Sequence, residues 1–143
     1  MKIAIGSDHG GFDLKAQLIP ALIELGYEVI DCGTNSKESV DYPDFAVIVA
    51  ENVKNKNADY GVLICTTGEG ISMAANKIMG IRSGIAYNDD VASLMRKHND
   101  ANIISFGAKY VTFEEALTRI KIFVTTQFEG GRHLRRVEKI NKI

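Results

Sequence analysis

Residues 60–65, YGVLIC, form a short apolar run that is followed at once by residues 66–70, TTGEG, and then by a helical pattern over residues 71–78. A short apolar run bounded by glycine and polar residues is typical of a buried strand. Strand, glycine-containing turn and helix in this order are the repeating unit of proteins built around a parallel sheet. The stretch from Tyr60 to Ile78 therefore predicts an α/β fold.

The same alternation continues in both directions along the chain. Further short apolar runs occur at residues 2–5, 27–31, 82–86 and 102–106, with Gly, Asn or Asp soon after each. Together with residues 60–65 they predict a five-stranded parallel sheet with helices on both faces, a three-layer Rossmann-like fold. A length of 143 residues fits one domain, so we expect a single domain over residues 1–143.

Helical periodicity predicts the segments between the strands. One helix carries a leucine stripe at spacings of four, four and three: Leu14, Leu18, Leu22 and Leu25. Gly26 supplies its stop, and Pro43 opens a second helix.

The later helices are shorter or capped more clearly. Residues 71–78 and 91–97 predict two short helices, and Thr112 with Glu115 forms a capping box for a helix that runs through residue 123. A final basic helix is expected after the glycine pair at residues 130–131.

Composition excludes several classes of protein. Apolar residues make up 45% and charged residues 24% of the chain, which is ordinary for a folded soluble protein. Seventeen Lys and Arg against eighteen Asp and Glu give a net charge of −1, so we expect neither nucleic acid nor a membrane as partner. Two cysteines and no secretory or membrane-spanning run predict a reduced, cytoplasmic protein.

Polar residues follow three of the predicted strands. They are residues 7–11 (SDHGG), 65–70 (CTTGEG) and 106–109 (FGAK). Ligands of an open parallel sheet bind beyond the carboxyl ends of the strands. We therefore expect the three segments to share one rim and to form the site.

The segment from Thr66 to Gly70 is typical of a turn that enters a helix. Free backbone N–H groups and the helix dipole favour a negative charge there, and they favour the thiolate form of a cysteine at the mouth of the turn. The residues equally fit a structural role for Cys65 as the last core residue of a strand.

Familiar motifs on similar turns are excluded by single residues. A cysteine phosphatase needs Arg where Ile71 stands, and a dinucleotide-binding loop needs Gly where Met73 stands. The chain also lacks the Gly-Lys-Ser or Gly-Lys-Thr sequence that ends a phosphate-binding P-loop.

Histidines and arginines give a second group of candidates. His9, His98 and His133 are each expected in a loop or at a helix start, where a histidine is most often simply solvated. Arg132 and Arg136 lie four residues apart, which puts them on one helix face and suits them to grip a phosphate, although a run of charge is often just a solvated surface.

Six stretches carry a resemblance across the whole chain: residues 6–11 (GSDHGG), 40–43 (VDYP), 65–72 (CTTGEGIS), 74–77 (AANK), 98–102 (HNDAN) and 130–133 (GGRH). In this order they resemble the type B ribose-5-phosphate isomerases and their relatives, the galactose-6-phosphate and allose-6-phosphate isomerases. The resemblance implies an aldose-ketose isomerase of the pentose phosphate pathway that uses no metal or organic cofactor. It also implies a homodimer or homotetramer whose sites draw residues from two chains.

The resemblance also implies a role for individual residues. His98 matches the acid/base that opens the sugar ring, and Cys65 matches the base that moves the carbon-bound proton. Thr67 matches a proton relay between oxygens, within an oxyanion pocket formed by the backbone of Thr66, Gly68 and Gly70. The implied substrate-binding residues are Asp8, His9, Asn99, Lys109, Arg132 and Arg136.

Two departures and one ambiguity remain. Most members have Gly at the position of Thr66 and commonly Arg at the position of Lys109, so pocket shape or phosphate affinity is expected to shift. One branch of the family uses a Glu at the position of Glu69 as its base. This chain carries both Cys65 and Glu69, and we favour Cys65.

Two alternative functions stay in view. A six-carbon sugar phosphate isomerase is the nearer alternative, although Cys65, His98 and the GGRH segment together favour the five-carbon sugar. A phosphoreceiver domain would suit Asp8 and Lys109, but it needs an Asp where Cys65 stands.

Overall fold

Five parallel strands form one sheet in the order β2-β1-β3-β5-β4 in the computed structural model, which describes residues 1–143. The strands are β1 (Lys2–Ser7), β2 (Glu28–Asp31), β3 (Tyr60–Cys65), β4 (Ser83–Ile85) and β5 (Ile103–Gly107). All four pairings are parallel, so the carboxyl ends of the strands lie at the same edge of the sheet. The predicted α/β fold class is confirmed.

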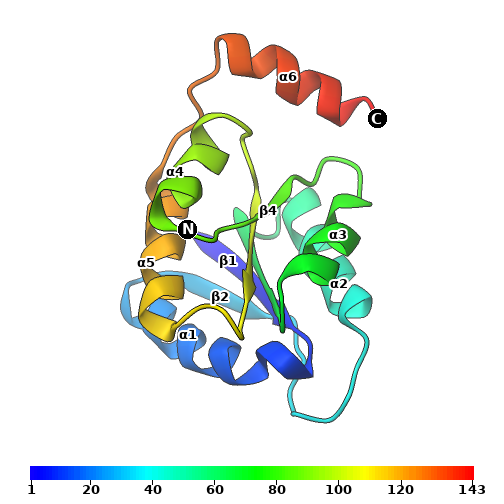
Figure 1. Cartoon of the computed structure of the whole chain (residues 1–143), viewed down its shortest axis with the longest axis vertical. Helices are drawn as coiled ribbons and strands as arrows, with labels where there is room; N and C mark the ends of the chain where they lie inside the picture. The colour runs from blue at the N-terminus through cyan, green and yellow to red at the C-terminus, as the bar shows by residue number, and fades with distance from the viewer.

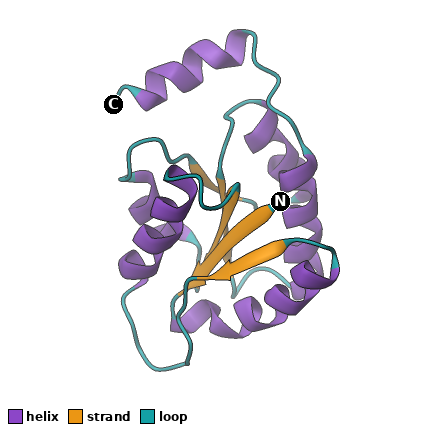
Figure 2. Cartoon of the chain, turned by 180° about the vertical axis from the view of Figure 1, so that it is seen from behind, coloured by secondary structure: helices purple, strands orange, loops and turns teal.

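Helices cover both faces of this sheet, as Figures 1 and 2 show. They are α1 (Phe12–Glu24), α2 (Tyr42–Lys54), α3 (Glu69–Asn76), α4 (Asp89–Lys97), α5 (Phe113–Thr125) and α6 (Arg132–Asn141), with a 3-10 turn at His9–Gly11. One apolar core lies under α1, α4 and α5, and a second lies under α2 and α3. Residues of the central strands alternate between the two cores, as Ile3 and Ala4 do.

The order in which strands are added to the sheet reverses between β1 and β3. The chain passes from β1 outward to β2 and then returns to the other side of β1 as β3. In an open α/β sheet such a switch leaves a crevice at the carboxyl ends of the two strands. The segments that follow β1 and β3 therefore begin on either side of this crevice.

Several boundaries differ from the sequence predictions. The first strand is expected from the sequence to end at Ile5 but continues to Ser7. The pairing with β3 continues through Ser7 and Ile64 after the apolar pattern has ended. The helix expected over residues 71–78 begins at Glu69 and ends at Asn76, because Gly68 caps its start. Strand β4 is an edge strand of three residues and is shorter than expected.

The leucine stripe of α1 is only partly confirmed. Leu14, Leu18 and Leu22 are buried as predicted, but Leu25 is 48% exposed. Helix α1 ends at Glu24, so Leu25 is its C-cap and lies past the last turn that packs on the sheet. The capping box of Thr112 and Glu115 is confirmed, with both reciprocal hydrogen bonds present.

Helix α6 lies apart from the other helices, beyond the end of α4 (Figure 1). Only His133 and Val137 of this helix are buried. No helix of the structure combines the length and the apolar character needed to cross a bilayer.

The difference between Leu22 and Leu25 is open to direct measurement. Leu22→Ala should lower the free energy of unfolding by about 2–5 kcal/mol, because it leaves a cavity in the core. Leu25→Ala should change it by less than about 0.5 kcal/mol, because the side chain is already half in water. Urea unfolding at one fixed chain concentration compares the two, and equal losses would contradict the burial described for α1.

Candidate active site

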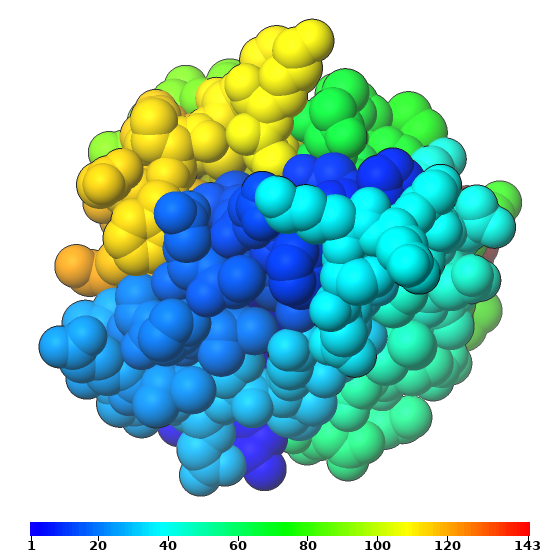
Figure 3. Space-filling view, turned by 90° about the horizontal axis from the view of Figure 1, so that it is seen from below, coloured from blue at the N-terminus to red at the C-terminus, as the bar shows by residue number.

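Three segments that follow strands meet at the carboxyl edge of the sheet, as predicted. Backbone hydrogen bonds join them: the Asp8 N–H donates to the Ile64 carbonyl (3.3 Å), and the Lys109 N–H donates to the Thr66 carbonyl (3.1 Å). Figure 3 looks onto this face, where the segment after β1 (blue), the start of α3 (green) and the segment after β5 (yellow) come together. We call this face the carboxyl rim.

The turn between β3 and α3 is held in one conformation by Gly68. Its φ of +81° is the left-handed region that glycine adopts without strain. A Cβ atom at this position would lie 2.9 Å from the backbone nitrogen of Gly107, so the turn also packs directly against the end of β5. A side chain at residue 68 would therefore displace the turn.

Cys65 sits where this turn leaves the sheet. Its side chain is buried, and its Sγ accepts a hydrogen bond from the Gly68 N–H at 3.1 Å. The structural interpretation of Cys65 is confirmed, because the residue packs in the core under α2 and α3, and its sulfur also faces the turn. A donor to sulfur stabilises negative charge on it.

Further hydrogen-bonding groups of the turn are free for a ligand. The N–H groups of Thr67 and Gly70 donate to no group in the chain. The Thr67 hydroxyl accepts the N–H of Glu69 at 3.3 Å, which leaves its own proton for another acceptor. The turn can therefore offer both backbone donors and one hydroxyl to an oxyanion.

Asp8 and His9 lie beside this turn on the segment after β1. Asp8 is buried, and its Oδ1 accepts the Gly11 N–H at 3.1 Å. His9 is exposed, and its Nδ1 accepts the Val40 N–H at 3.2 Å. That hydrogen bond assigns the proton of the neutral ring to Nε2, which is then a donor directed to other partners.

Thr66 and Lys109, the two departures from the resembled family, fit the rim in different ways. Thr66 does not have a positive φ, so the turn requires glycine at Gly68 and not at residue 66. The Thr66 hydroxyl instead fills the space where a Cβ of Gly10 would lie. Lys109 is exposed and forms no ion pair; its Nζ lies 5.7 Å from the centre of the Tyr110 ring.

Glu69 occupies the first turn of α3 and is exposed. It lines a cavity of about 850 Å³ together with Thr67, Ser72, Tyr87 and Tyr110. The carboxylate is thus near the mouth of the turn, and both candidates for a base lie at the same rim.

The remaining predicted residues lie at the opposite edge of the sheet. Helix α4 runs back against the strand direction, so His98 and Asn99 follow it near the start of β5. Gly107 at the end of β5 pairs with Cys65, whereas Ile103 at its start pairs with Gly61. At about 3.3 Å per residue, the length of β5 alone separates the two edges by at least about 13 Å.

Arg132 and Arg136 also lie at this second edge, on α6. Both are exposed and form no hydrogen bond or ion pair within the chain. One chain therefore brings together Asp8, His9, Lys109 and the turn from Cys65 to Gly70. It holds His98, Asn99, Arg132 and Arg136 in a separate group, which we call the amino-edge group.

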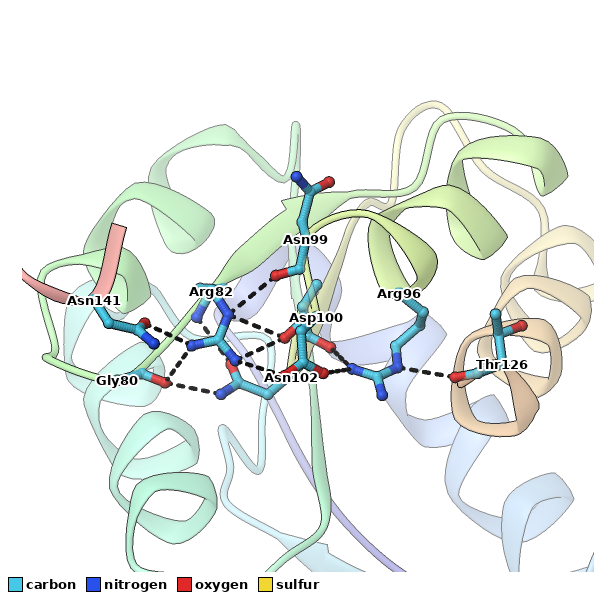
Figure 4. A network of polar contacts seen from close by, with 9 residues as sticks. Gly80, Arg82, Arg96, Asn99, Asp100, Asn102, Thr126 and Asn141 are labelled. Carbon is cyan, nitrogen blue, oxygen red and sulfur yellow. Dashed lines mark hydrogen bonds and ion pairs between the residues drawn. The ribbon is translucent and has the colours of Figure 1, made fainter. Parts of the chain in front are cut away.

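A network of arginines fixes the backbone of this group (Figure 4). Asp100 has a positive φ of 46°, and its carboxylate binds Arg96 at 2.8 Å and Arg82 at 3.4 Å. Arg82 also donates from Nε to the Asn99 carbonyl at 3.1 Å. In Figure 4 the side-chain amide of Asn99 points away from these contacts, so it stays free while its backbone is held.

His98 and His133 lie in the kinds of position that the sequence predicts. His98 is the C-cap of α4, in the turn that follows the helix, and His133 is the second residue of α6. His133 is buried rather than solvated, and its ring stacks on that of His98 with centroids 4.3 Å apart and 15° between planes. The sequence analysis gave His133 no role, because nothing in its spacing reveals a stacked partner.

Glu129 completes the one group of side chains that has the composition of a metal site, with ligand atoms of Glu129, His98 and His133 all within 4.8 Å of one another. The geometry does not suit a metal ion. Lone pairs of imidazole lie in the ring plane, so two nearly parallel stacked rings direct them side by side and not toward one point. Arg132 and Arg136 on α6 add positive charge beside the group.

Sequence reasoning also missed Tyr42 and the two arginines of the network. The Tyr42 ring lies 2.5 Å from where a Cβ of Gly70 would be, so it packs against the backbone of the turn. Its segment, VDYP, has no spacing or residue type that indicates this contact. Cys32, the other cysteine, is no candidate for thiolate chemistry, because burial raises its pKa to about 11.

Comparison with known proteins identifies this arrangement. The family model described as Ribose/Galactose Isomerase matches residues 3–140. The chain belongs to this family.

Individual relatives cover almost the whole chain. Ribose-5-phosphate isomerase B of Escherichia coli is 48% identical over 142 residues, which are 99% of this chain and 95% of that protein. The solved structure of Clostridium thermocellum ribose-5-phosphate isomerase B is 51% identical, with a TM-score of 0.97 over 99% of this chain and 96% of that one.

A third relative was solved with a ligand. The structure of Mycoplasma genitalium ribose-5-phosphate isomerase B, described as having bound ribulose-5-phosphate, is 40% identical with a TM-score of 0.93. It covers 99% of this chain and 94% of that one. The family predicted from the six stretches is confirmed.

Proposed function

We propose that this chain is a type B ribose-5-phosphate isomerase that interconverts ribose 5-phosphate and ribulose 5-phosphate. The observation that carries the proposal is the likeness, over 99% of the chain, to an isomerase of this type solved with ribulose-5-phosphate bound. The proposal treats residues 1–143 as one sugar-phosphate isomerase domain, and it places the reaction in the pentose phosphate pathway of the cytoplasm.

The reaction moves two protons and uses no metal or organic cofactor. After ring opening, a base removes the proton on carbon 2 of the aldose, and the electron pair forms the double bond of an enediolate. Return of a proton to carbon 1 gives the ketose. The protein must supply an acid/base for the ring, a base for carbon, and donors to the enediolate oxygens.

In our proposal the carboxyl rim supplies the base for carbon and the donors to the enediolate oxygens. Cys65 is the base at carbon, and the Gly68 N–H on its sulfur supports a thiolate. The free N–H groups of Thr67 and Gly70 bind the enediolate, and the Thr67 hydroxyl relays a proton between its oxygens. Glu69 remains the alternative base. Asp8 and His9 bind sugar hydroxyls, with the His9 Nε2–H as a donor.

The amino-edge group supplies the rest, from a second chain. His98 opens the ring, Asn99 binds the open sugar, and Arg132 and Arg136 hold the phosphate, which Lys109 assists from the rim. The length of β5 separates Cys65 from the amino-edge group, and no five-carbon substrate bridges the two edges of one sheet. This distance supports a site shared between two chains. A two-fold axis that brings one chain's rim to its partner's amino edge builds two equivalent sites. We accordingly propose a homodimer, or a homotetramer of such pairs.

Substrate choice is tested by a panel of sugar phosphates. The purified protein should convert ribose 5-phosphate with a higher kcat/KM than allose 6-phosphate or galactose 6-phosphate. Conversion is followed by the appearance of the ketose product. A preference for either six-carbon sugar would replace the proposed substrate with its alternative, and no turnover of any member would reject an isomerase.

The base is tested by paired variants at the rim. Cys65→Ala should lower kcat by at least about a thousandfold while substrate still binds, since proton transfer is lost and the phosphate grip is not. Glu69→Gln should keep most of the activity. Steady-state kinetics with calorimetric measurement of binding separates the two effects. The reverse result, an active Cys65→Ala and an inactive Glu69→Gln, would assign the base to Glu69.

The shared site is tested by complementation between inactive chains. In a mixed dimer of Cys65→Ala and His98→Ala chains, one site has both defects and the other has neither. An equal mixture allowed to exchange should regain about a quarter of wild-type activity, since half the dimers are mixed and each has one intact site. Native mass spectrometry confirms exchange. If exchange is complete and activity stays absent, both residues serve from the same chain.

A further inference from the structure

The His98 imidazole stacks on the ring of His133. No hydrogen bond within the chain reaches the His98 side chain, although its backbone N–H donates to the Leu94 carbonyl at 2.8 Å. The stacked His133 ring lies 4.3 Å away and is only 8% exposed. A stack uses the face of the His98 ring, so both of its ring nitrogens stay free to exchange protons.

His133 in turn fastens the start of α6 to the end of α4. It is the second residue of α6, and Val137 one turn later is the only other buried residue of that helix. Just before the helix, the Glu129 N–H donates to the Lys97 carbonyl at 3.1 Å. The stack therefore joins His98, at the end of α4, to the start of α6, where Arg132 directly precedes His133.

The groups around His133 disfavour its charged form and lower its pKa. Burial is the largest cause, and the neighbouring His98, Arg132 and Arg136 act in the same direction. Glu129, whose Oε2 lies 3.7 Å from the His133 Nε2, is the one facing group that opposes them. The neutral form of the His133 ring is thus the favoured one.

We propose that His133 is a positioning residue for the isomerase reaction, a flat ring that fixes the imidazole of His98 in register with Arg132 and Arg136. This inference rests on the proposed function, in which His98 opens the ring and the arginines hold the phosphate. Fixing an acid/base before the substrate arrives matters because a misplacement of about 1 Å costs roughly a hundredfold in rate.

The test compares two replacements of the platform. His133→Phe keeps a flat neutral ring, and its kcat for ribose 5-phosphate should stay within about threefold of wild type with an unchanged pH profile. His133→Leu keeps the bulk and loses the flat ring, and its kcat should fall by about 10- to 100-fold. Its pH profile should shift as well, because His98 is then free to move into water.

Val137→Ala is the matched control, since it loosens the same helix without touching His98. It should raise KM through Arg136 and leave kcat nearly unchanged, whereas His133→Leu should act mainly on kcat. Glu129→Gln should behave as wild type, because it removes only the group that favours a charged His133. Thermal unfolding of each variant checks that it is folded.

Several outcomes would overturn the proposal. They are a His133→Leu enzyme with wild-type kcat and pH profile, a His133→Phe enzyme as impaired as His133→Leu, or a Val137→Ala enzyme with the same loss of kcat. Loss of activity in EDTA with recovery on added zinc would replace the platform with a metal site.

Failure of the proposed function is a distinct result. A wild-type protein without isomerase activity, or a fully active His98→Ala enzyme, rejects the assigned reaction or the role of His98. The stack itself has an independent readout in the NMR shift of the His98 ring protons. That shift should be retained in His133→Phe and lost in His133→Leu, and an unchanged shift in His133→Leu would show that the ring of His133 does not hold His98.

Discussion

The direction of the strands governs where every polar group of this chain can lie. In a parallel sheet each strand ends at one edge, and each covering helix brings the chain back to the other. Residues that follow strands, such as Cys65 and Lys109, are therefore gathered at the carboxyl rim. Residues that follow a returning helix, such as His98, are delivered to the opposite edge. The division of the candidate site into two groups is a consequence of topology and not of any single contact.

Sequence patterns predicted the fold class and the rim well, because both depend on local features. Apolar runs such as residues 60–65 end where glycine and polar residues begin, and the register of the strands then aligns those ends. The pattern mispredicted element boundaries where tertiary contacts, and not local sequence, decide where a strand or helix ends. Ser7 is polar but belongs to β1 because its partner strand continues beside it, and Leu25 completes a helical stripe but lies beyond the helix.

The amino-edge group was harder to read from sequence for the same reason. The four-residue spacing of Arg132 and Arg136 suggested a phosphate grip, but only resemblance linked the two arginines to His98, because the spacing from His98 to Arg132 contains no signal that they adjoin. The contacts that hold them come from distant segments: Arg82 lies before β4, Asp100 after α4, and His133 on α6. Charged side chains at such positions look like solvated surface until a structure places them together. Periodicity indicated only the two arginines of α6, and their joining with His98 and Asn99 came from resemblance alone.

The two groups are also stabilised by different kinds of interaction, and this explains which substitutions each accepts. At the rim the backbone fixes the geometry, through Gly68 at positive φ and the strand-to-turn hydrogen bonds, and Thr66, whose φ is not positive, fits the turn without needing to be glycine. At the amino edge the geometry rests on side chains, on the carboxylate of Asp100 between two arginines and on the ring of His133. Departures from the family at the rim therefore alter what a side chain offers to the ligand, whereas a change at the amino edge alters where the acid/base itself stands.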